Sequence, residues 1–300
     1  MKKLLFVYNP FSGKGLIRIK LSDILDRMVK AGYEVTVHPT QSKEDARTLM
    51  EEAAGRYELI VCSGGDGTLD EVVSGMVKSG ACVPIGYIPA GSTNDFANSL
   101  GLSKDMMQAA ETALTGAAFP CDAGFFNEKV FVYVAAFGLF TDVSYLTDQN
   151  LKNILGHAAY ILEGAKRLAD ITAYHMTVEY DGQIVDGDFL YGMITNSTSV
   201  GGFEGMTGKD VLLDDGLFEV TLIRMPQNML ELNEILASLT NLIPSTELVL
   251  SFKTKQIRFS SPEKVPWTLD GEYGGSESDA LIRNARQAVT LMVEEKREEH

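Results

Sequence analysis

Several kinds of residue and pattern are scarce in this sequence, and each shortage excludes a class of protein. Cysteine occurs three times in 300 residues, at scattered positions, which is too few for a disulfide framework or a thiolate metal site. The four histidines show no metal-ligand spacing. No segment approaches 18 consecutive apolar residues, and Met1-Lys2-Lys3 leads directly into a short apolar segment, so we expect neither a transmembrane helix nor a signal peptide. These absences are typical of a cytoplasmic protein.

Basic residues are also outnumbered. The sequence has 26 Lys and Arg against 41 Asp and Glu, which gives a formal net charge of −15. Without a basic stripe, we expect no nucleic-acid partner. The same excess of negative charge opposes strong electrostatic adhesion to an anionic membrane.

The length of the chain predicts two domains, because 300 residues exceed one typical domain. In residues 1–121, short apolar segments alternate with helical periodicity, which indicates a doubly wound α/β domain with a parallel sheet. The predicted strands are Leu4–Tyr8, Tyr33–His38, Glu58–Cys62 and Pro84–Ile88. The predicted helices are Leu16–Lys30, Ser42–Ala54 with Ser42 as its cap, Leu69–Val77 and Met106–Leu114.

Residues 122–284 have the texture of a second, antiparallel and β-rich domain. The predicted strands are Lys129–Ala136, Met176–Tyr180, Phe189–Asn196, Leu217–Ile223, Leu248–Phe252, Gln256–Ser260 and Val265–Leu269. Helices are predicted near Asn150–Ile171 and Asn228–Asn241, and Trp267 is expected to pack in the core. A last strand, Ala288–Val293, is a candidate to complete the first domain with residues 285–300.

The most informative motif is Gly64-Gly65-Asp66-Gly67-Thr68, which lies between a predicted buried strand and a predicted helix. Glycines at such a junction let phosphate oxygens approach the backbone N–H groups at the positive end of the helix. The motif lacks the Lys-Ser/Thr ending of a P-loop and the spacing of a dinucleotide fingerprint. The alternative is a tight turn that merely needs glycine.

Three further segments follow predicted parallel strands in the same way. They are Asn9–Gly13, Thr40 and Gly91–Asp95. Ligands of open α/β sheets bind at the carboxyl ends of the strands. Together, these four segments predict a nucleotide site.

Four motifs carry a resemblance to a known family. They are Asn9-Pro10-x-Ser12-Gly13, Gly64-Gly65-Asp66-Gly67-Thr68-Leu69-x-Glu71-Val72, Pro89-x-Gly91-Ser92-x-Asn94-Asp95-Phe96-Ala97 and Asp270-Gly271-Glu272. The sequence resembles the soluble diacylglycerol kinases and sphingosine kinases, above all the bacterial diacylglycerol kinase branch, over nearly its whole length. NAD kinases and phosphofructokinases carry similar glycine turns, but the last two motifs are more selective. Asp70 and Ser92 depart from the Asn and Thr usual in such proteins.

The resemblance implies an α/β nucleotide-binding domain, a β-sandwich domain, and ATP bound in the cleft between them. Asp66 would organise a catalytic Mg²⁺, although a cap on the following helix is the alternative for this side chain. Residues implied to surround ATP are Asn9, Pro10, Phe11, Ser12, Gly13, Thr40, Gly64, Gly65, Asp66, Gly67, Thr68, Glu71, Gly91, Ser92, Thr93, Asn94 and Asp95.

Two implied sites belong to the second domain. Asp270 is the candidate general base, with Glu272 as the runner-up, and the alternative for Asp270 is a simple hairpin turn. A structural Mg²⁺ is implied at the Asp215 carboxylate with the carbonyl groups of Leu212 and Leu217, where an ordinary turn is the alternative.

The resemblance therefore implies an ATP-dependent lipid kinase that phosphorylates diacylglycerol, or a related lipid, to phosphatidic acid. Its partners would be ATP and a lipid at the membrane surface, which the cytoplasmic protein meets transiently. A homodimer is compatible with the sequence. The alternatives are a kinase of a soluble substrate, such as NAD, and a nucleotide-binding regulator without turnover.

Overall fold

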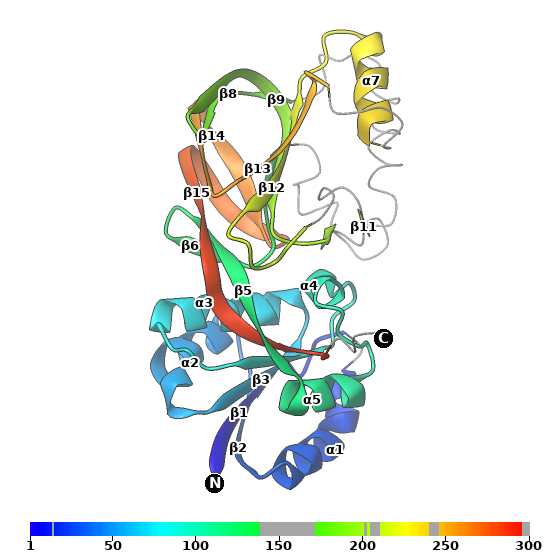
Figure 1. Ribbon diagram of the computed structural model, residues 1–300, viewed down its shortest axis with the longest axis vertical. Helices are drawn as coiled ribbons and strands as arrows, with labels where there is room; N and C mark the ends of the chain where they lie inside the picture. The colour runs from blue at the N-terminus through cyan, green and yellow to red at the C-terminus, as the bar shows by residue number, and fades with distance from the viewer. Residues whose placement is uncertain (14, 139–171, 201–202, 205–210, 240–245, 296–300) are drawn as a thin grey trace. The chain divides into compact units, whose positions relative to one another are not determined.

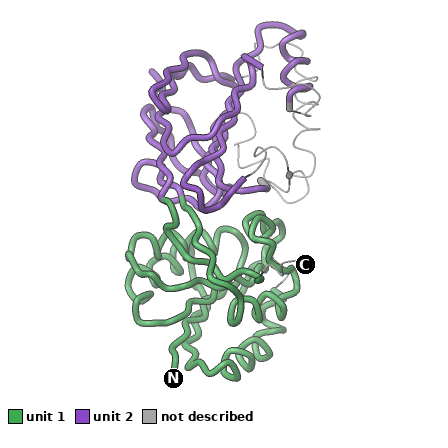
Figure 2. Tube along the Cα trace, viewed as in Figure 1, with its two compact units in different colours: residues 1–123, 286–300 green, residues 124–285 purple. Residues whose placement is uncertain are grey.

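The computed structural model describes residues 1–13, 15–138, 172–200, 203–204, 211–239 and 246–295. The chain forms two compact units, one of residues 1–123 with 286–300 and the other of residues 124–285 (Figure 2). Unit 1 is therefore discontinuous in sequence, and unit 2 is inserted into it.

Unit 1 is built on a parallel sheet in the order β2-β1-β3-β4. The end of β15 adds a fifth parallel strand beside β4, where Leu291 pairs with Ile85. The strands are β1 (Lys2–Tyr8), β2 (Tyr33–Pro39), β3 (Leu59–Gly64), β4 (Ile85–Pro89) and β15 (Glu272–Val293). Every residue of β3 and β4 is buried, as expected for strands covered on both faces.

Helices cover both faces of this sheet (Figure 1). They are α1 (Leu16–Lys30), α2 (Asp45–Ala53), the 3₁₀ turn η1 (Ala54–Arg56), α3 (Asp66–Ser79), α4 (Asp95–Ser99) and α5 (Met106–Thr115). Helix α1 packs with α5, and α2 packs with α3. The core on one face joins strand residues such as Phe6 and Val61 to Ile24 of α1 and Ala109 of α5. The predicted doubly wound α/β fold is confirmed.

The predicted cap of α2 is wrong. The helix begins at Asp45, not at Ser42, and no side chain of its own segment caps it. Instead, the Glu71 carboxylate of α3 accepts the backbone N–H groups of Glu44 at 2.8 Å and Ala46 at 3.2 Å. A distant carboxylate thus replaces the local hydroxyl, because α2 and α3 pack together.

Unit 2 is antiparallel and β-rich. Its strands are β5 (Ala117–Phe126, which begins in unit 1), β6 (Lys129–Phe131), β7 (Val134–Gly138), β8 (Tyr174–Tyr180), β9 (Gln183–Thr195), β12 (Phe218–Arg224), β13 (Val249–Thr254), β14 (Gln256–Leu269) and the first part of β15. A short pair, β10 (Ser199–Val200) and β11 (Phe203–Glu204), and helix α7 (Met229–Leu239) complete its described elements. The main order is β13-β12-β9-β7-β14-β15, and β8 pairs with both β9 and β14.

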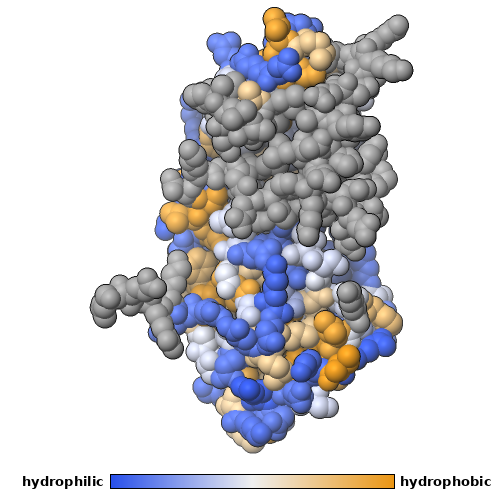
Figure 3. Space-filling model, turned by 90° about the vertical axis from the view of Figure 1, so that its right-hand side faces the viewer, coloured by the Kyte–Doolittle hydropathy of each residue, from blue (hydrophilic) through white to orange (hydrophobic). Residues whose placement is uncertain are grey.

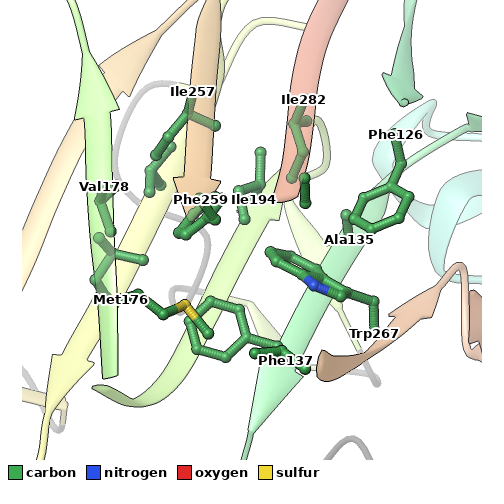
Figure 4. Packing of buried hydrophobic residues seen from close by; sticks show 14 of the residues in the cluster. Phe126, Ala135, Phe137, Met176, Val178, Ile194, Ile257, Phe259, Trp267 and Ile282 are labelled. Carbon is green, nitrogen blue, oxygen red and sulfur yellow. The ribbon is translucent and has the colours of Figure 1, made fainter. Parts of the chain in front are cut away.

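Aromatic side chains fill the core of unit 2 (Figure 4). Trp267 is buried, and its ring centroid lies 4.9 Å from that of Phe137, 5.0 Å from that of Phe126 and 5.2 Å from that of Phe259. The expectation that Trp267 packs in the core is confirmed.

Three of the predicted strands are divided or joined in the structure. The segment predicted as Lys129–Ala136 is divided into β6 and β7, while Gln256–Ser260 and Val265–Leu269 form one strand, β14, with a register shift between Ser260 and Val265. The helix predicted at Asn150–Ile171 lies outside the described residues. The helix predicted at Asn228–Asn241 is α7, of which the structure describes Met229–Leu239.

Candidate active site

Three of the predicted nucleotide loops meet at the carboxyl end of the unit 1 sheet. The contact depends on glycine, because a Cβ atom on Gly91 would lie 2.7 Å from the Cα atom of Gly65. A Cβ atom on Gly13 would likewise lie 2.2 Å from the carbonyl oxygen of Ala90. Any larger residue at these positions would push the loops apart.

Hydrogen bonds between backbone groups hold these loops to the strand ends. Asn9 N–H donates to Ser63 O at 2.8 Å, and Ala90 N–H donates to Gly64 O at 2.7 Å. The fourth predicted segment joins them, because Thr40 N–H donates to Tyr8 O at 2.9 Å. The structure therefore brings Asn9–Gly13, Thr40, Gly64–Thr68 and Gly91–Asp95 to one edge of the sheet.

Asp66 is the first residue of α3, and it links two of these loops. Its carboxylate accepts the backbone N–H groups of Asp95 at 3.2 Å and Phe96 at 3.4 Å. The side chain therefore caps α4, not its own helix. Asn94 is turned back on its loop, with Gly91 N–H donating to its Oδ1 at 2.9 Å and its Nδ2 donating to Gly91 O at 2.8 Å.

Glu71 and Phe11, two other residues predicted to contact ATP, make different contacts in the structure. Glu71 caps α2, as described above. Phe11 is 77% exposed, and the Arg18 guanidinium carbon lies 4.8 Å from its ring centroid. Among the residues that the structure describes, no three His, Cys, Asp or Glu side chains gather to hold a metal ion.

In unit 2, Asp270 and Gly271 form the two-residue turn between β14 and β15, with φ angles of 49° and 84°. The buried Asp270 carboxylate accepts three backbone N–H groups, from Val132 at 2.6 Å, Tyr133 at 3.0 Å and Val134 at 2.9 Å. These donors lie in and beside the gap between β6 and β7, so the carboxylate accounts for the division of the predicted strand. Hydrogen bonds of this kind stabilise the ionised form of a carboxylate.

Glu272 lies two residues further, at the start of β15, and is exposed. Asp270, the candidate general base, thus also forms the hairpin turn that was its alternative, and its carboxylate is a buried acceptor of backbone N–H groups. Of the two candidate bases, Glu272 is therefore the one that is exposed to solvent.

The segment proposed for a structural Mg²⁺ forms a tight turn. Asp215 Oδ1 accepts the Leu217 N–H at 2.9 Å, and Leu217 O accepts Asn284 Nδ2 at 3.3 Å. Within the described residues, the buried Asn284 Oδ1 has no hydrogen-bond donor. An oxygen acceptor without a donor, on the same amide group that contacts the Leu217 carbonyl oxygen, fits a hard cation. Leu212, the third predicted ligand, is 56% exposed.

Comparisons with known proteins agree with the motifs. The family model of the diacylglycerol kinase catalytic domain matches residues 3–126. The diacylglycerol kinase of Bacillus subtilis is 34% identical over 302 residues, covering 100% of this chain and 99% of that protein. The diacylglycerol kinase of Staphylococcus carnosus is 37% identical over 297 residues, covering 97% and 94%.

The chain belongs to the diacylglycerol kinase family. The resemblance inferred from the motifs is thereby confirmed. The crystal structure of a diacylglycerol kinase from Bacillus anthracis aligns with a TM-score of 0.75 at 20% identity, covering 97% of both chains. At that identity the likeness supports the fold of this family member, an α/β unit with an antiparallel β-rich unit.

Two buried polar residues of this diacylglycerol kinase family member lie outside the four sequence motifs. Tyr87 of β4 donates its hydroxyl to Gly64 O at 3.1 Å, and burial, with the nearby Asp66 charge, raises the pKa of that hydroxyl well above its ordinary value. Asp122 of β5 is 1% exposed and accepts the Gln287 N–H at 2.7 Å. A polar side chain in an otherwise apolar buried strand is the signal that could have found both.

No helix in the described ranges of this family member is long and apolar enough to cross a membrane.

Proposed function

We propose that the protein is an ATP-dependent lipid kinase, which transfers a phosphoryl group from ATP to the hydroxyl group of diacylglycerol or a related lipid and yields phosphatidic acid. One observation carries the proposal. Three loops meet through glycines at the carboxyl edge of a parallel sheet, with Asp66 at the start of α3. This is the place where nucleotides bind in open α/β sheets.

The phosphates of ATP would lie against the first turn of α3. Gly65 and Gly67 leave its backbone open, and the N–H groups at a helix start attract anions. Asn9, Ser12, Thr40, Ser92 and the neighbouring predicted residues would surround the rest of the nucleotide.

Mg²⁺ would neutralise negative charge on the phosphates when it is bound. A single carboxylate, with phosphate and water oxygens, is a donor set that Mg²⁺ accepts, and Asp66 fits it. Asp66 would hold the ion while its cap on α4 keeps the carboxylate in place.

For the proton of the lipid hydroxyl, the surroundings of the two acids favour Glu272 over Asp270. The Asp270 carboxylate is buried and already accepts three backbone N–H groups, whereas Glu272, close by in the chain, is exposed. In this proposal Glu272 accepts the proton and Asp270 positions the turn that carries it. This reverses the order that the motif alone favoured.

Thin-layer separation of labelled products tests the proposal. The purified protein would be incubated with radiolabelled ATP, Mg²⁺ and one acceptor at a time, namely diacylglycerol, monoacylglycerol, ceramide, sphingosine or NAD. We expect labelled phosphatidic acid, and none from an Asp66→Ala variant. Labelled NADP would instead indicate a kinase of a soluble substrate, and ATP bound without any product would indicate a regulator.

A further inference from the structure

One buried polar side chain contacts the glycine motif from below the surface. Tyr87 of β4 is 1% exposed, and its hydroxyl donates to Gly64 O at 3.1 Å. Gly64 is the last residue of β3 and the first of the glycine motif. Figure 3 shows one side of the surface, but a side chain with 1% exposure contributes almost nothing to the surface on any side. Tyr87 therefore acts on a bound nucleotide only through the residues that it contacts.

The carbonyl oxygen of Gly64 accepts two hydrogen bonds. Besides the Tyr87 hydroxyl, the Ala90 N–H donates to the same oxygen at 2.7 Å. A carbonyl oxygen has two lone pairs, so both bonds form together, and two donors restrict its direction more than one donor does. Gly64 also lies tightly against α3, because a Cβ atom on it would be 2.3 Å from Thr68 Oγ1. The Gly64 carbonyl group is thus held in one direction.

The direction of this carbonyl group sets the direction of the next N–H group. Gly64 C=O and Gly65 N–H belong to one planar trans peptide, in which the two groups point in opposite directions. The carbonyl group points to the side of β4, and β3 lies between β4 and β1. The Gly65 N–H therefore points to the side of β1. Ser12, in the loop that follows β1, has its Oγ 3.6 Å from the place where a Cβ atom of Gly65 would lie.

The Gly65 N–H is also a suitable donor to an anion. Gly65 is the N-cap residue of α3, and the N–H groups at a helix start have no acceptor within the helix. Anions are stabilised there by the positive end of the helix dipole.

We propose that Tyr87 is a positioning residue for phosphate binding, whose hydroxyl holds the Gly64 carbonyl group and so aims the Gly65 N–H at the phosphates of the nucleotide. This role rests on the proposed function, since it needs a phosphate-bearing nucleotide at this edge of the sheet. Tyr87 itself touches neither the nucleotide nor the reacting atoms.

Tyr87→Phe tests this role, because it removes the hydroxyl and keeps the ring. Gly64 O retains the Ala90 N–H, so we expect a melting temperature close to that of the parent. With one donor left, the Gly65 N–H is less well aimed. The Kd values for ATP and for inorganic tripolyphosphate should rise by roughly 3–10-fold, the usual effect of losing one hydrogen bond. The Kd for adenosine, which has no phosphate, should stay the same. Isothermal titration calorimetry without lipid measures all three.

Tyr191→Phe is the matched control. Tyr191 is a buried tyrosine of β9 in unit 2, 7% exposed, and the loss of its hydroxyl should leave the three Kd values unchanged. Each titration is repeated without Mg²⁺. The same fold-change for tripolyphosphate with and without the ion supports a backbone donor. A change seen only with Mg²⁺ would overturn the role, because the effect would then pass through the metal at Asp66.

A purely structural contribution of Tyr87 would give a different result. Tyr87→Phe would then melt well below the parent and, while folded, bind tripolyphosphate with the parental Kd, which would overturn the role. Steady-state kinetics gives a second readout. The KM for ATP should rise while kcat at saturating ATP stays near the parental value, because the hydrogen bond acts on nucleotide binding. A parent that binds no tripolyphosphate would also overturn the role.

Lipid phosphorylation separates the role of Tyr87 from the proposed function. If the parent makes labelled phosphatidic acid while Tyr87→Phe binds ATP and tripolyphosphate as the parent does, only the role of Tyr87 is wrong. If Tyr87→Phe binds tripolyphosphate more weakly while the parent phosphorylates no acceptor, the role of Tyr87 stands and the kinase proposal fails.

Discussion

At the scale of single residues, Asp270 has two roles, because its backbone forms a turn and its side chain is a buried carboxylate. Its backbone makes the tight connection between β14 and β15, and its carboxylate accepts the backbone N–H groups of Val132, Tyr133 and Val134. Removing its charge should disturb folding as well as any chemistry nearby. Glu272, by contrast, is exposed at the start of β15.

This difference predicts opposite behaviour for two amide substitutions. Glu272→Gln should lower kcat by roughly 10²–10⁴-fold, the usual effect of losing a general base, with an unchanged melting temperature. Asp270→Asn should lower the free energy of unfolding by about 1–3 kcal/mol, because an amide cannot accept all three N–H groups. Steady-state kinetics and thermal melts of both variants check this. A stable Asp270→Asn variant with very low kcat, beside an active Glu272→Gln variant, would return the base to Asp270.

The three thiols should also differ in reactivity. Cys62 and Cys121 are buried, Cys82 is exposed, and burial raises the pKa of the Cys62 thiol from 9.0 to about 12. At pH 8 we therefore expect one thiol to react quickly with Ellman's reagent in the native protein, and all three to react after denaturation.

The sign of the Cys62 shift adds an alkaline test. Since the folded pKa lies above the unfolded one, this thiol stabilises the native state below pH 9, and that contribution is lost as the pH rises toward 12. Cys62 should thus become reactive only as alkaline unfolding begins. Fast labelling of Cys62 at pH 8 would contradict its burial.

At the scale of helices and strands, features set by a local sequence pattern could be predicted, whereas features set by residues distant in the sequence could not. The helix Leu16–Lys30 was predicted at its observed bounds, because its apolar residues repeat with helical spacing. The convergence of the loops was predictable too, since parallel strands end at one edge of a sheet. Ser42 failed as a cap, because the actual cap comes from Glu71 on another helix. The gap between β6 and β7 depends on Asp270, which is 136 or more residues away in the sequence. A local sequence pattern cannot predict partners such as Glu71 and Asp270, because they lie far away in the sequence.

The cap on α2 gives a prediction at this scale. Glu71→Ala should lower the free energy of unfolding by about 1 kcal/mol, because two N–H groups at the start of α2 lose their acceptor. Asp70→Asn is the matched control, one residue earlier on α3, and should leave stability within about 0.5 kcal/mol of the parent. Urea unfolding followed by circular dichroism measures both. If Glu71→Ala instead raises the KM for ATP at parental stability, Glu71 contacts the nucleotide and is not mainly a cap.

At the scale of the whole molecule, a cation bound to the native state would raise the free energy of unfolding. If Asp215, Leu217 and their neighbours hold Mg²⁺, excess ion should raise the melting temperature of the parent, since a ligand of the native state stabilises it by about 2.7 kcal/mol at 100 times Kd. Asp215→Ala should melt earlier and show no response to Mg²⁺, whereas Asp214→Asn should still respond. Differential scanning calorimetry with Mg²⁺ and with EDTA measures the shift. Identical melts under both conditions would mean that the turn holds no ion.

The division of unit 1 into two stretches of sequence has a consequence for synthesis on the ribosome. The strand that covers the free side of β4 belongs to the last residues made, and all of unit 2 is translated in between. At about 5–20 residues per second, the nascent chain spends roughly 10–40 s with that edge uncovered. Unit 2 can fold during this interval, but unit 1 cannot be finished. A message cut short before residue 286 would leave a permanently open strand edge, which is a template for aggregation.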